Sequence, residues 1–497
     1  MHVACAYPRH EWKCNGCRAM RAFASIVLLL VVAGCATTSV NPPITSTHPE
    51  SGYRLEARLR DQDAKENLVI LAFSGGGTRA AAFAYGVLEF LRATEIVGAR
   101  GNTRRLLDEV DIITGVSGGS FTALAYGLYG EQLFVDYEQR FLKRNVQGEL
   151  LARALSPAYW ASLMTTGWGR SELAAEYYDE ILFGGATFAD LDRGRGPLIL
   201  ASATDISTGS RFVFTQRTFD ILCSDLNAVP LSRAAAASSA VPVVLSAVTV
   251  TNYGGTCNAG LPAWATTFLE SPNPPRAAAR AIRSLRAEQA MAEGARRPFL
   301  HLVDGGVSDN VGMRSVLDVL QILESLHAAG QSTPLDGARR IVIYIVNSLS
   351  TPPTDWDASP TPPSAVDILL KAAGTPIDAH SHEAVELLKD TAYRWQTLRR
   401  IRESRAFATN TDPAIADALR VPAASIYAID VSFAALRDKQ ELDYLNRQST
   451  SFALPAEAVD RLRAAAATII RASPEFQRLL DDVGARIAPA ELDPNGE

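Results

Sequence analysis

Residues 115–119 read Gly-Val-Ser-Gly-Gly, the pattern G-x-S-x-G in which a serine lies between glycines. The apolar residues 110–114 predict a buried strand before it, and residues 120–126 predict a helix after it. A sharp turn between a strand and a helix holds a serine hydroxyl clear of the backbone, where an acyl carbonyl can reach it. Ser117 is therefore a candidate nucleophile for acyl transfer. An ordinary Gly/Ser turn is the alternative interpretation.

A second glycine-rich segment lies upstream and reads Ser-Gly-Gly-Gly-Thr-Arg over residues 74–79. It follows a predicted buried strand at residues 68–73 and precedes a predicted helix at residues 80–91. A glycine loop at a helix N-terminus presents free backbone N–H groups at the positive end of the helix dipole, which suits an anion. In acyl transfer that anion is the oxygen of the tetrahedral intermediate.

A dinucleotide site is the alternative for this loop, because Gly75-x-Gly77-x-x-Ala80 satisfies a loose Rossmann fingerprint. That fingerprint also needs an acidic residue about 20 positions later, at the end of the next strand. The next predicted strand ends in Thr114-Gly115, which argues against a dinucleotide. A Walker loop is excluded because no Lys-Ser/Thr pair follows the glycines.

A third motif, Asp304-Gly305-Gly306, follows a short predicted strand at residues 299–303. A carboxylate at the C-terminal end of a strand lies at the edge where open α/β sheets build their sites. An Asp-Gly turn that caps a helix is the alternative interpretation. Because all three motifs follow strands, we expect the strand ends to deliver them to the same edge of one sheet.

Taken in this order, the three motifs resemble the patatin-like phospholipase family over roughly residues 66–350. Residues 237–242, Ala-Ser-Ser-Ala-Val-Pro, also resemble a segment common in that family. The resemblance implies a three-layer α/β/α sandwich with a mostly parallel central sheet. It also implies an acyl-ester hydrolase of the phospholipase A or lysophospholipase type, with a phospholipid or lysophospholipid substrate. We expect neither a cofactor nor a metal site, and the sequence leaves a calcium requirement open.

By the same resemblance, Ser117 is the nucleophile and Asp304 its partner in a Ser-Asp dyad without histidine. The residues assigned to the oxyanion hole are Gly75, Gly76, Gly77, Arg79 and Gly118. Ala80 stands where the family's glycine motif usually has its last glycine, which we interpret as mild crowding. An exposed aspartate, with a pKa near 3.9, is a poor base, and burial in a cleft raises that pKa toward neutral pH.

A histidine triad is the alternative mechanism, because α/β-hydrolases place serine, acid and histidine in that order along the chain. His380 or His382 could complete such a triad with Asp304. These two histidines are two positions apart at the start of a predicted helix, so they point to different faces, which argues against a shared metal site. His301 is predicted to be a packed residue of the sheet. The competing functional class is a non-catalytic lipoprotein that keeps the fold and binds lipid or a partner.

Residues 1–35 resemble the signal region of a bacterial lipoprotein. The apolar run at residues 23–32 follows two arginines and is too short to span a membrane, which is typical of a signal peptide. It ends in Val-Ala-Gly-Cys, which resembles a lipobox, so Cys35 is expected to be lipidated and to begin the mature chain. Met20 stands where such signals usually begin, and residues 1–19 are expected to precede the true start.

This signal predicts a protein anchored by lipid in the bacterial cell envelope. Ala36 stands after the lipidated cysteine in place of the Asp associated with inner-membrane retention, which favours the outer membrane, facing the periplasm. Cys223 and Cys257 then remain in the mature domain, where an oxidising compartment allows a disulfide between them. Two unpaired buried cysteines are the alternative.

Composition is that of a globular enzyme, since 47% of the 497 residues are hydrophobic. The net charge of -6 and the pI near 5.8 give no reason to expect nucleic acid as a partner. We expect four segments: the signal region at residues 1–35, a polar tether at 36–65, the catalytic domain at 66–350, and a proline-rich linker with a helical C-terminal extension at 351–497.

Overall fold

The structure is a computed structural model of the chain. It describes residues 41–48, 51–54, 66–97, 102–157, 159–160, 169–193, 196–242, 244–274, 279–331, 333, 337–351, 354–407, 412–419 and 421–488. The signal region, with Met20 and Cys35, lies outside these residues, so its assignment stays a prediction. None of the described helices is long and apolar enough to cross a membrane.

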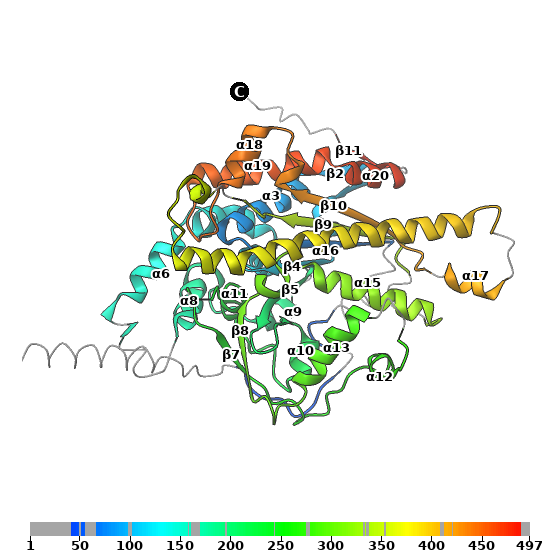
Figure 1. Cartoon of the computed structure of the whole chain (residues 1–497), viewed down its shortest axis with the longest axis horizontal. Helices are drawn as coiled ribbons and strands as arrows, with labels where there is room; N and C mark the ends of the chain where they lie inside the picture. The colour runs from blue at the N-terminus through cyan, green and yellow to red at the C-terminus, as the bar shows by residue number, and fades with distance from the viewer. Residues whose placement is uncertain are drawn as a thin grey trace, which may run out of the picture.

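The centre of the fold is an eight-stranded sheet with the order β10-β9-β1-β4-β5-β8-β7, in which β6 also pairs with β5 (Figure 1). Its strands are β1 (Asn67–Phe73), β4 (Ile112–Val116), β5 (Leu198–Asp205), β6 (Ser210–Val213), β7 (Val248–Thr251), β8 (Phe299–Asp304), β9 (Arg340–Asn347) and β10 (Ser425–Ser432). The neighbours from β10 to β5 run parallel, whereas β8 runs antiparallel to both β5 and β7. The near-continuous apolar runs of β1 and β9 suit strands that are covered on both faces.

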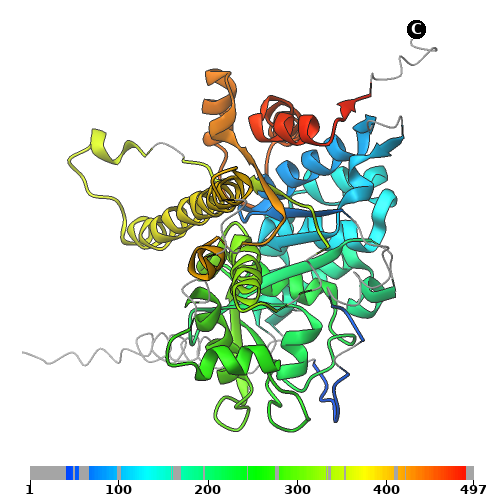
Figure 2. The same cartoon turned by 90° about the vertical axis from the view of Figure 1, so that its right-hand side faces the viewer.

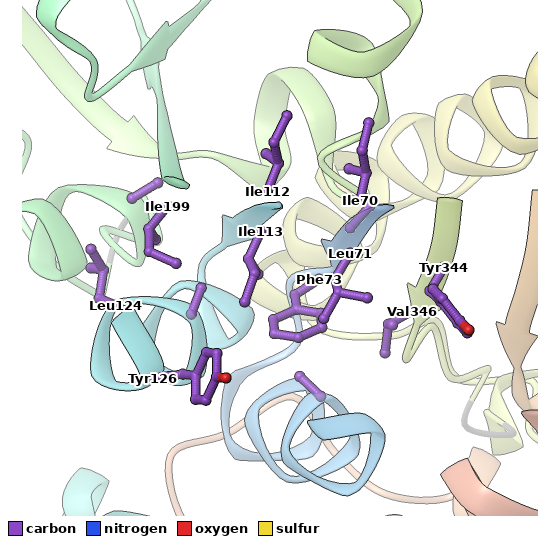
Figure 3. Close-up of a cluster of buried hydrophobic side chains, with 14 of the residues drawn as sticks. Ile70, Leu71, Phe73, Ile112, Ile113, Leu124, Tyr126, Ile199, Tyr344 and Val346 are labelled. Atoms are coloured by element: carbon purple, nitrogen blue, oxygen red, sulfur yellow. The ribbon is translucent and has the colours of Figure 1, made fainter. Parts of the chain in front are cut away.

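Helices cover both faces of this sheet. Figure 3 shows Ile70 and Ile112 projecting from one face, while Leu71 and Ile113 project from the other, toward α3 (Gly77–Ala93). The second of these faces also carries α4 (Gly118–Tyr129) and α19 (Ala456–Ala472), and α15 (Met313–Ala328) and α16 (Ala365–Glu403) lie on the first. The chain is therefore a three-layer α/β/α sandwich with a mostly parallel sheet, as the sequence predicts.

The other described elements have between two and thirteen residues. The helices are α5 (Leu133–Tyr137), α6 (Val146–Ala154), α8 (Arg170–Tyr178), α9 (Phe188–Arg193), α10 (Gln216–Ile221), α11 (Leu231–Ser238), α12 (Ala263–Glu270), α13 (Ala279–Met291), α14 (Gly306–Asp309), α17 (Pro413–Ala418), α18 (Lys439–Asn446) and α20 (Pro474–Asp482). A small second sheet joins β11 (Arg486–Ile487), β2 (Glu95–Val97) and β3 (Thr103–Arg105).

The segment after residue 351 differs from the expected helical extension, because it adds both a strand and a helix to the sandwich. β10 pairs in parallel with β9 along its full length, from Ser425 opposite Arg340 to Ser432 opposite Asn347. Figure 2 shows α19 lying beside α3, and the apolar face of α19 is buried there. The C-terminal part of the chain is thus integral to the domain.

The predicted polar tether also differs from the structure where the structure describes it. The Asn41 side-chain amide donates to Ser224 Oγ and to the carbonyl of Thr251, each at 2.8 Å. Tyr53 is completely buried, and its hydroxyl accepts a hydrogen bond from the backbone N–H of Ile199 at 2.6 Å. A buried aromatic ring with a satisfied hydroxyl anchors this segment against the domain.

Candidate active site

Ser117 occupies a strained turn between β4 and α4. Its φ of 48° and ψ of -121° lie in a region that residues other than glycine rarely adopt. Its backbone N–H donates to Ser238 Oγ at 2.8 Å, and that hydroxyl donates onward to the carbonyl of Ser202 at 2.7 Å. A Cβ at Gly119 would lie 2.6 Å from the carbonyl oxygen of Ser74, so only glycine permits this approach of helix and strand. These hydrogen bonds and the close packing at Gly119 hold the turn in its strained conformation.

Asp304 reaches the same edge of the sheet from the opposite direction. The strand that carries it, β8, runs antiparallel to β5, although the motifs alone suggested a common strand direction. In the register, Asp304 lies opposite Ala203, one residue beyond Ser202, which itself lies opposite Val116. β8 therefore begins beyond the C-terminal end of β4, runs back toward it, and ends beside the Ser117 turn.

The side chains of Ser117 and Asp304 are in direct contact. Ser117 Oγ donates to Asp304 Oδ2 at 2.8 Å, and the other carboxylate oxygen accepts from the backbone N–H of Gly306 at 2.7 Å. The backbone around Asp304 is held by Asp304 N–H to the Ala240 carbonyl at 2.9 Å and by Gly305 N–H to the Ser238 carbonyl at 3.0 Å. Only 5% of Ser117 and 7% of Asp304 are exposed to solvent, so the pair is nearly dry.

Burial raises the pKa of Asp304 to about 6, from a usual value of 3.8. The hydrogen bonds from the Gly306 N–H and from Ser117 oppose this rise, because they stabilise the carboxylate. A carboxyl group with this pKa is ionised at neutral pH and can also hold a proton for part of a catalytic cycle. The pair thus combines a hydroxyl with a base of suitable strength.

The glycine loop lies at the N-terminus of α3, against the Ser117 turn. Gly76 and Gly77 have φ of 137° and 60°, and a Cβ at Gly77 would lie 2.4 Å from the Ser451 carbonyl oxygen. The N–H of Gly75 is used, since it donates to the Asn310 carbonyl at 2.8 Å. In the described part of the chain, the N–H groups of Gly76 and Gly77 have no hydrogen-bond partner.

Gly118 adds a third amide from the first position of α4. A Cβ on Gly118 would lie 2.7 Å from the backbone nitrogen of Gly77, so the two helix starts touch. Its N–H also has no partner among the described residues. Two helix N-termini therefore converge beside Ser117, and both favour negative charge there.

Arg79 uses its donors for other acceptors, although it was expected to contribute to an oxyanion hole. Its Nε donates to the Ser348 carbonyl at 2.7 Å, its Nη1 to the Gln448 carbonyl at 2.7 Å and its Nη2 to Thr450 Oγ1 at 3.1 Å. Burial lowers the pKa of Arg79 to about 10, with Asp378 opposing that change, so the guanidinium is charged at neutral pH. Arg79 clamps the start of α3 to the C-terminal part of the chain.

The histidines of the alternative triad form no described hydrogen bond with Ser117 or Asp304, although His380 lines a small cavity together with Gly306. His380 and His382 are exposed in the interior of α16 and not at a helix start. His301 is exposed on β8, where its Nδ1 lies 3.1 Å from Thr249 Oγ1, so it is not the packed sheet residue expected. The Ser117–Asp304 hydrogen bond leaves no space for an imidazole between the two side chains. The described residues also contain no group of three or more His, Cys, Asp or Glu side chains that could hold a metal ion.

Cys223 and Cys257 are joined by a disulfide, with their Cα atoms 5.6 Å apart. The bridge joins Cys223, two residues after the end of α10, to Cys257 in the loop before α12. It closes a loop with a sequence separation of 34, which includes α11 and therefore Ser238.

Comparison with known families places these motifs in one domain. The family model described as patatin-like phospholipase matches residues 71–317, which include the glycine loop, Ser117 and Asp304. The chain belongs to the patatin-like phospholipase family. A search of curated proteins finds no match.

Solved structures similar to this patatin-like chain share little sequence with it. Human GIVD cytosolic phospholipase A2 is 15% identical, with a TM-score of 0.41, over 90% of this chain and 66% of that protein. The same human protein in complex with methyl gamma-linolenyl fluorophosphonate and terbium chloride is 16% identical, with a TM-score of 0.38, over 86% and 62%. The type III effector protein ExoU is 16% identical, with a TM-score of 0.21, over 82% and 79%. This chain therefore spans just under two thirds of the human protein's length.

The patatin-like site also contains supporting residues that the sequence did not identify. Ser238 supports both sides of the Ser117–Asp304 pair, and it lies in the segment at residues 237–242 that the sequence flagged without a role. Ser348 Oγ donates to the carbonyl of Gly75 at 3.1 Å. Ser451 accepts from the N–H of Thr78 at 2.9 Å. These last contacts come from segments distant in sequence, where no local pattern marks them.

Proposed function

We propose that this protein is a serine acyl hydrolase that cleaves phospholipid or lysophospholipid esters with a Ser117–Asp304 dyad. Its family indicates lipid hydrolysis in general. The observation that carries the finer proposal is the 2.8 Å hydrogen bond from Ser117 Oγ to a buried Asp304 carboxylate with a raised pKa.

The reaction begins when Asp304 takes the proton from Ser117 as its Oγ attacks the acyl carbonyl. The carbonyl oxygen becomes an oxyanion, and the N–H groups of Gly76, Gly77 and Gly118 are placed to stabilise it. The tetrahedral intermediate collapses, the alcohol leaves with the proton held by Asp304, and an acyl-Ser117 ester remains. Water then attacks this ester, gives its proton to Asp304, and the freed carboxylic acid leaves while Ser117 recovers its proton.

We further propose that Cys35 carries a lipid anchor and that the enzyme works at a membrane surface of the bacterial envelope. The charged start, the short apolar run and the lipobox-like Val-Ala-Gly-Cys support this location. The Cys223–Cys257 disulfide is compatible with an oxidising compartment.

Turnover of a short-chain nitrophenyl ester tests the proposed chemistry. Ser117→Ala and Asp304→Asn should each remove nearly all activity, because nucleophile and base act as one unit. Ser207→Ala, at an exposed serine in the turn after β5, is the matched control and should keep full activity. Circular dichroism should show all three variants folded.

A covalent probe separates the proposal from its main competitor. A long-chain alkyl fluorophosphonate should label wild-type protein on Ser117 and should not label Ser117→Ala. Folded wild-type protein that neither turns over the ester nor accepts the label would support a non-catalytic lipid-binding lipoprotein instead.

A further inference from the structure

A cavity of about 1,050 Å³ lies on the face of the sheet that is turned away from α3. Its floor consists of aliphatic side chains from neighbouring strands, among them Ile70 and Ile112, which Figure 3 shows projecting away from α3. Its opposite wall is the apolar side of α15, including Val316 and Leu320. The cavity lining includes neither Ser117 and Asp304 nor the glycine loop. The cavity is therefore separate from the candidate active site.

The dimensions of the floor follow from the sheet. It extends across four adjacent strands, from Ile341 on β9 to Leu200 on β5, which at the usual strand spacing is about 14 Å. Along the strands it extends from Leu68 to the level of Thr114, four residues or about 13 Å. Pockets for small ligands are usually about 300–1,000 Å³, so this volume lies just above that range.

The charged groups of the cavity gather on one wall. Arg54 forms an ion pair with Asp220 of α10, and Arg217 of the same helix pairs with Glu288 at 2.7 Å. The Arg217 guanidinium also lies over the ring of Trp264, 5.8 Å from its centroid. The remaining surface is mainly aliphatic, so the cavity presents an apolar interior with one wall that carries Arg54, Arg217 and Asp220, each arginine being paired with a carboxylate.

A covalent bond holds this wall in place. The disulfide joins Cys223, which follows Asp220 in sequence by three residues, to Cys257, which directly precedes the lining residues 258–262. The loop at 258–262 is thereby fixed against α10. The disulfide therefore gives the wall that carries the arginines a fixed position in the fold.

We propose that this cavity binds the acyl chain of one long-chain fatty acid, with the carboxylate beside Arg217 and Arg54. The aliphatic floor removes the chain from water, which is the main source of affinity for such a ligand. Among the described contacts, the hydrogen bonds of Arg54 and Arg217 use Nε and Nη2, so the Nη1 donors are the groups left for the single anionic end of the ligand. This inference does not rest on the catalytic role of Ser117.

A substitution at Thr114 tests the proposed orientation of the fatty acid in the cavity separately. Its Oγ1 is buried without a hydrogen-bond partner among the described residues, and it lies three positions before Ser117 on β4. With the carboxylate at the arginines, the apolar tail approaches Thr114. Thr114→Val should then leave the affinity unchanged or raise it, whereas a clear loss of affinity would contradict this orientation.

The experiment is a titration with a fluorescent long-chain fatty acid, carried out in a Ser117→Ala background. Val319→Trp, on the cavity side of α15 where the valine is 40% exposed, fills the cavity without crowding a closed core. It should weaken binding at least tenfold. Val135→Trp, at a valine of α5 that is 78% exposed, is the matched control and should bind like the parent.

Two further measurements keep the outcome distinct from that of the proposed function. In the Ser117-containing protein, Val319→Trp should hydrolyse a short-chain nitrophenyl ester at the parent rate, because the active site is separate. Equal fatty-acid affinity in Val319→Trp and Val135→Trp would overturn the proposal. So would simple competition between the fatty acid and the short ester with an inhibition constant equal to the measured Kd, since that places the ligand at Ser117.

Discussion

The raised pKa of Asp304 makes a quantitative prediction about both stability and activity. The folded protein keeps a proton on Asp304 up to about pH 6, whereas the unfolded chain releases it near 3.8. The folded state therefore binds more protons than the unfolded state between these values, and its stability falls as the pH rises through them. A difference of this size corresponds to about 3 kcal/mol, which is the destabilisation that the ionised carboxylate imposes above pH 6.

Asp304→Asn removes this titration while keeping the size of the side chain. The free energy of unfolding should therefore shift in favour of the variant by about 3 kcal/mol between pH 4 and pH 8, measured by urea denaturation of both proteins. Taking the difference between the two proteins cancels the other titrating groups. Because the same carboxylate is the proposed base, kcat/KM of the wild type should rise with pH through about 6. A stability difference that does not change with pH would refute the raised pKa and with it this account of the base.

Three other changes test separate parts of the site. Gly76→Ala should lower kcat by about 10²–10³ with a smaller change in KM, since φ at this position is 137° and the displaced amide acts mainly in the transition state; steady-state kinetics decide this. Arg79→Met should lower the thermal midpoint and kcat together, because three backbone and side-chain acceptors lose their donor; a variant with full activity would show that the clamp does not position the loop. Cys35→Ser should abolish labelling by a palmitate analogue, leave the signal region uncleaved and change the fraction in which the protein is found, while hydrolysis of a soluble ester continues; unlabelled wild-type protein would contradict the anchor.

The sequence predicted those features that local patterns determine. A strand followed by G-x-S-x-G and a helix specifies the turn at Ser117, because the glycines and the apolar run lie within a few residues of the serine. The direction of β8 was not predictable in this way. Asp304-Gly305-Gly306 has the same local pattern whether its strand is parallel or antiparallel to β5, and only the pairing partner decides.

The C-terminal strand is a different case, because a local signal was present. Residues 425–432 form a short apolar run with several β-branched and aromatic side chains, which is typical of a buried strand, within a region interpreted as helical. The partners of Arg79 had no such signal. An arginine beside a glycine loop is equally compatible with an anion site and with a clamp, and its contacts with Gln448 and Thr450 depend on long-range packing.

The position of Arg79 connects the family domain with the part of the chain beyond it. The family match ends at residue 317, yet the start of α3 is held by Ser348 and by residues 448–451. A buried guanidinium needs acceptors, because an uncompensated buried charge is strongly destabilising. The loop is positioned through Arg79, Thr78 and the Gly75 N–H, and among the described residues this leaves the amides of Gly76 and Gly77 without a hydrogen-bond partner. The geometry of the candidate oxyanion hole is therefore a property of the whole sandwich, including β10 and the segment that follows it.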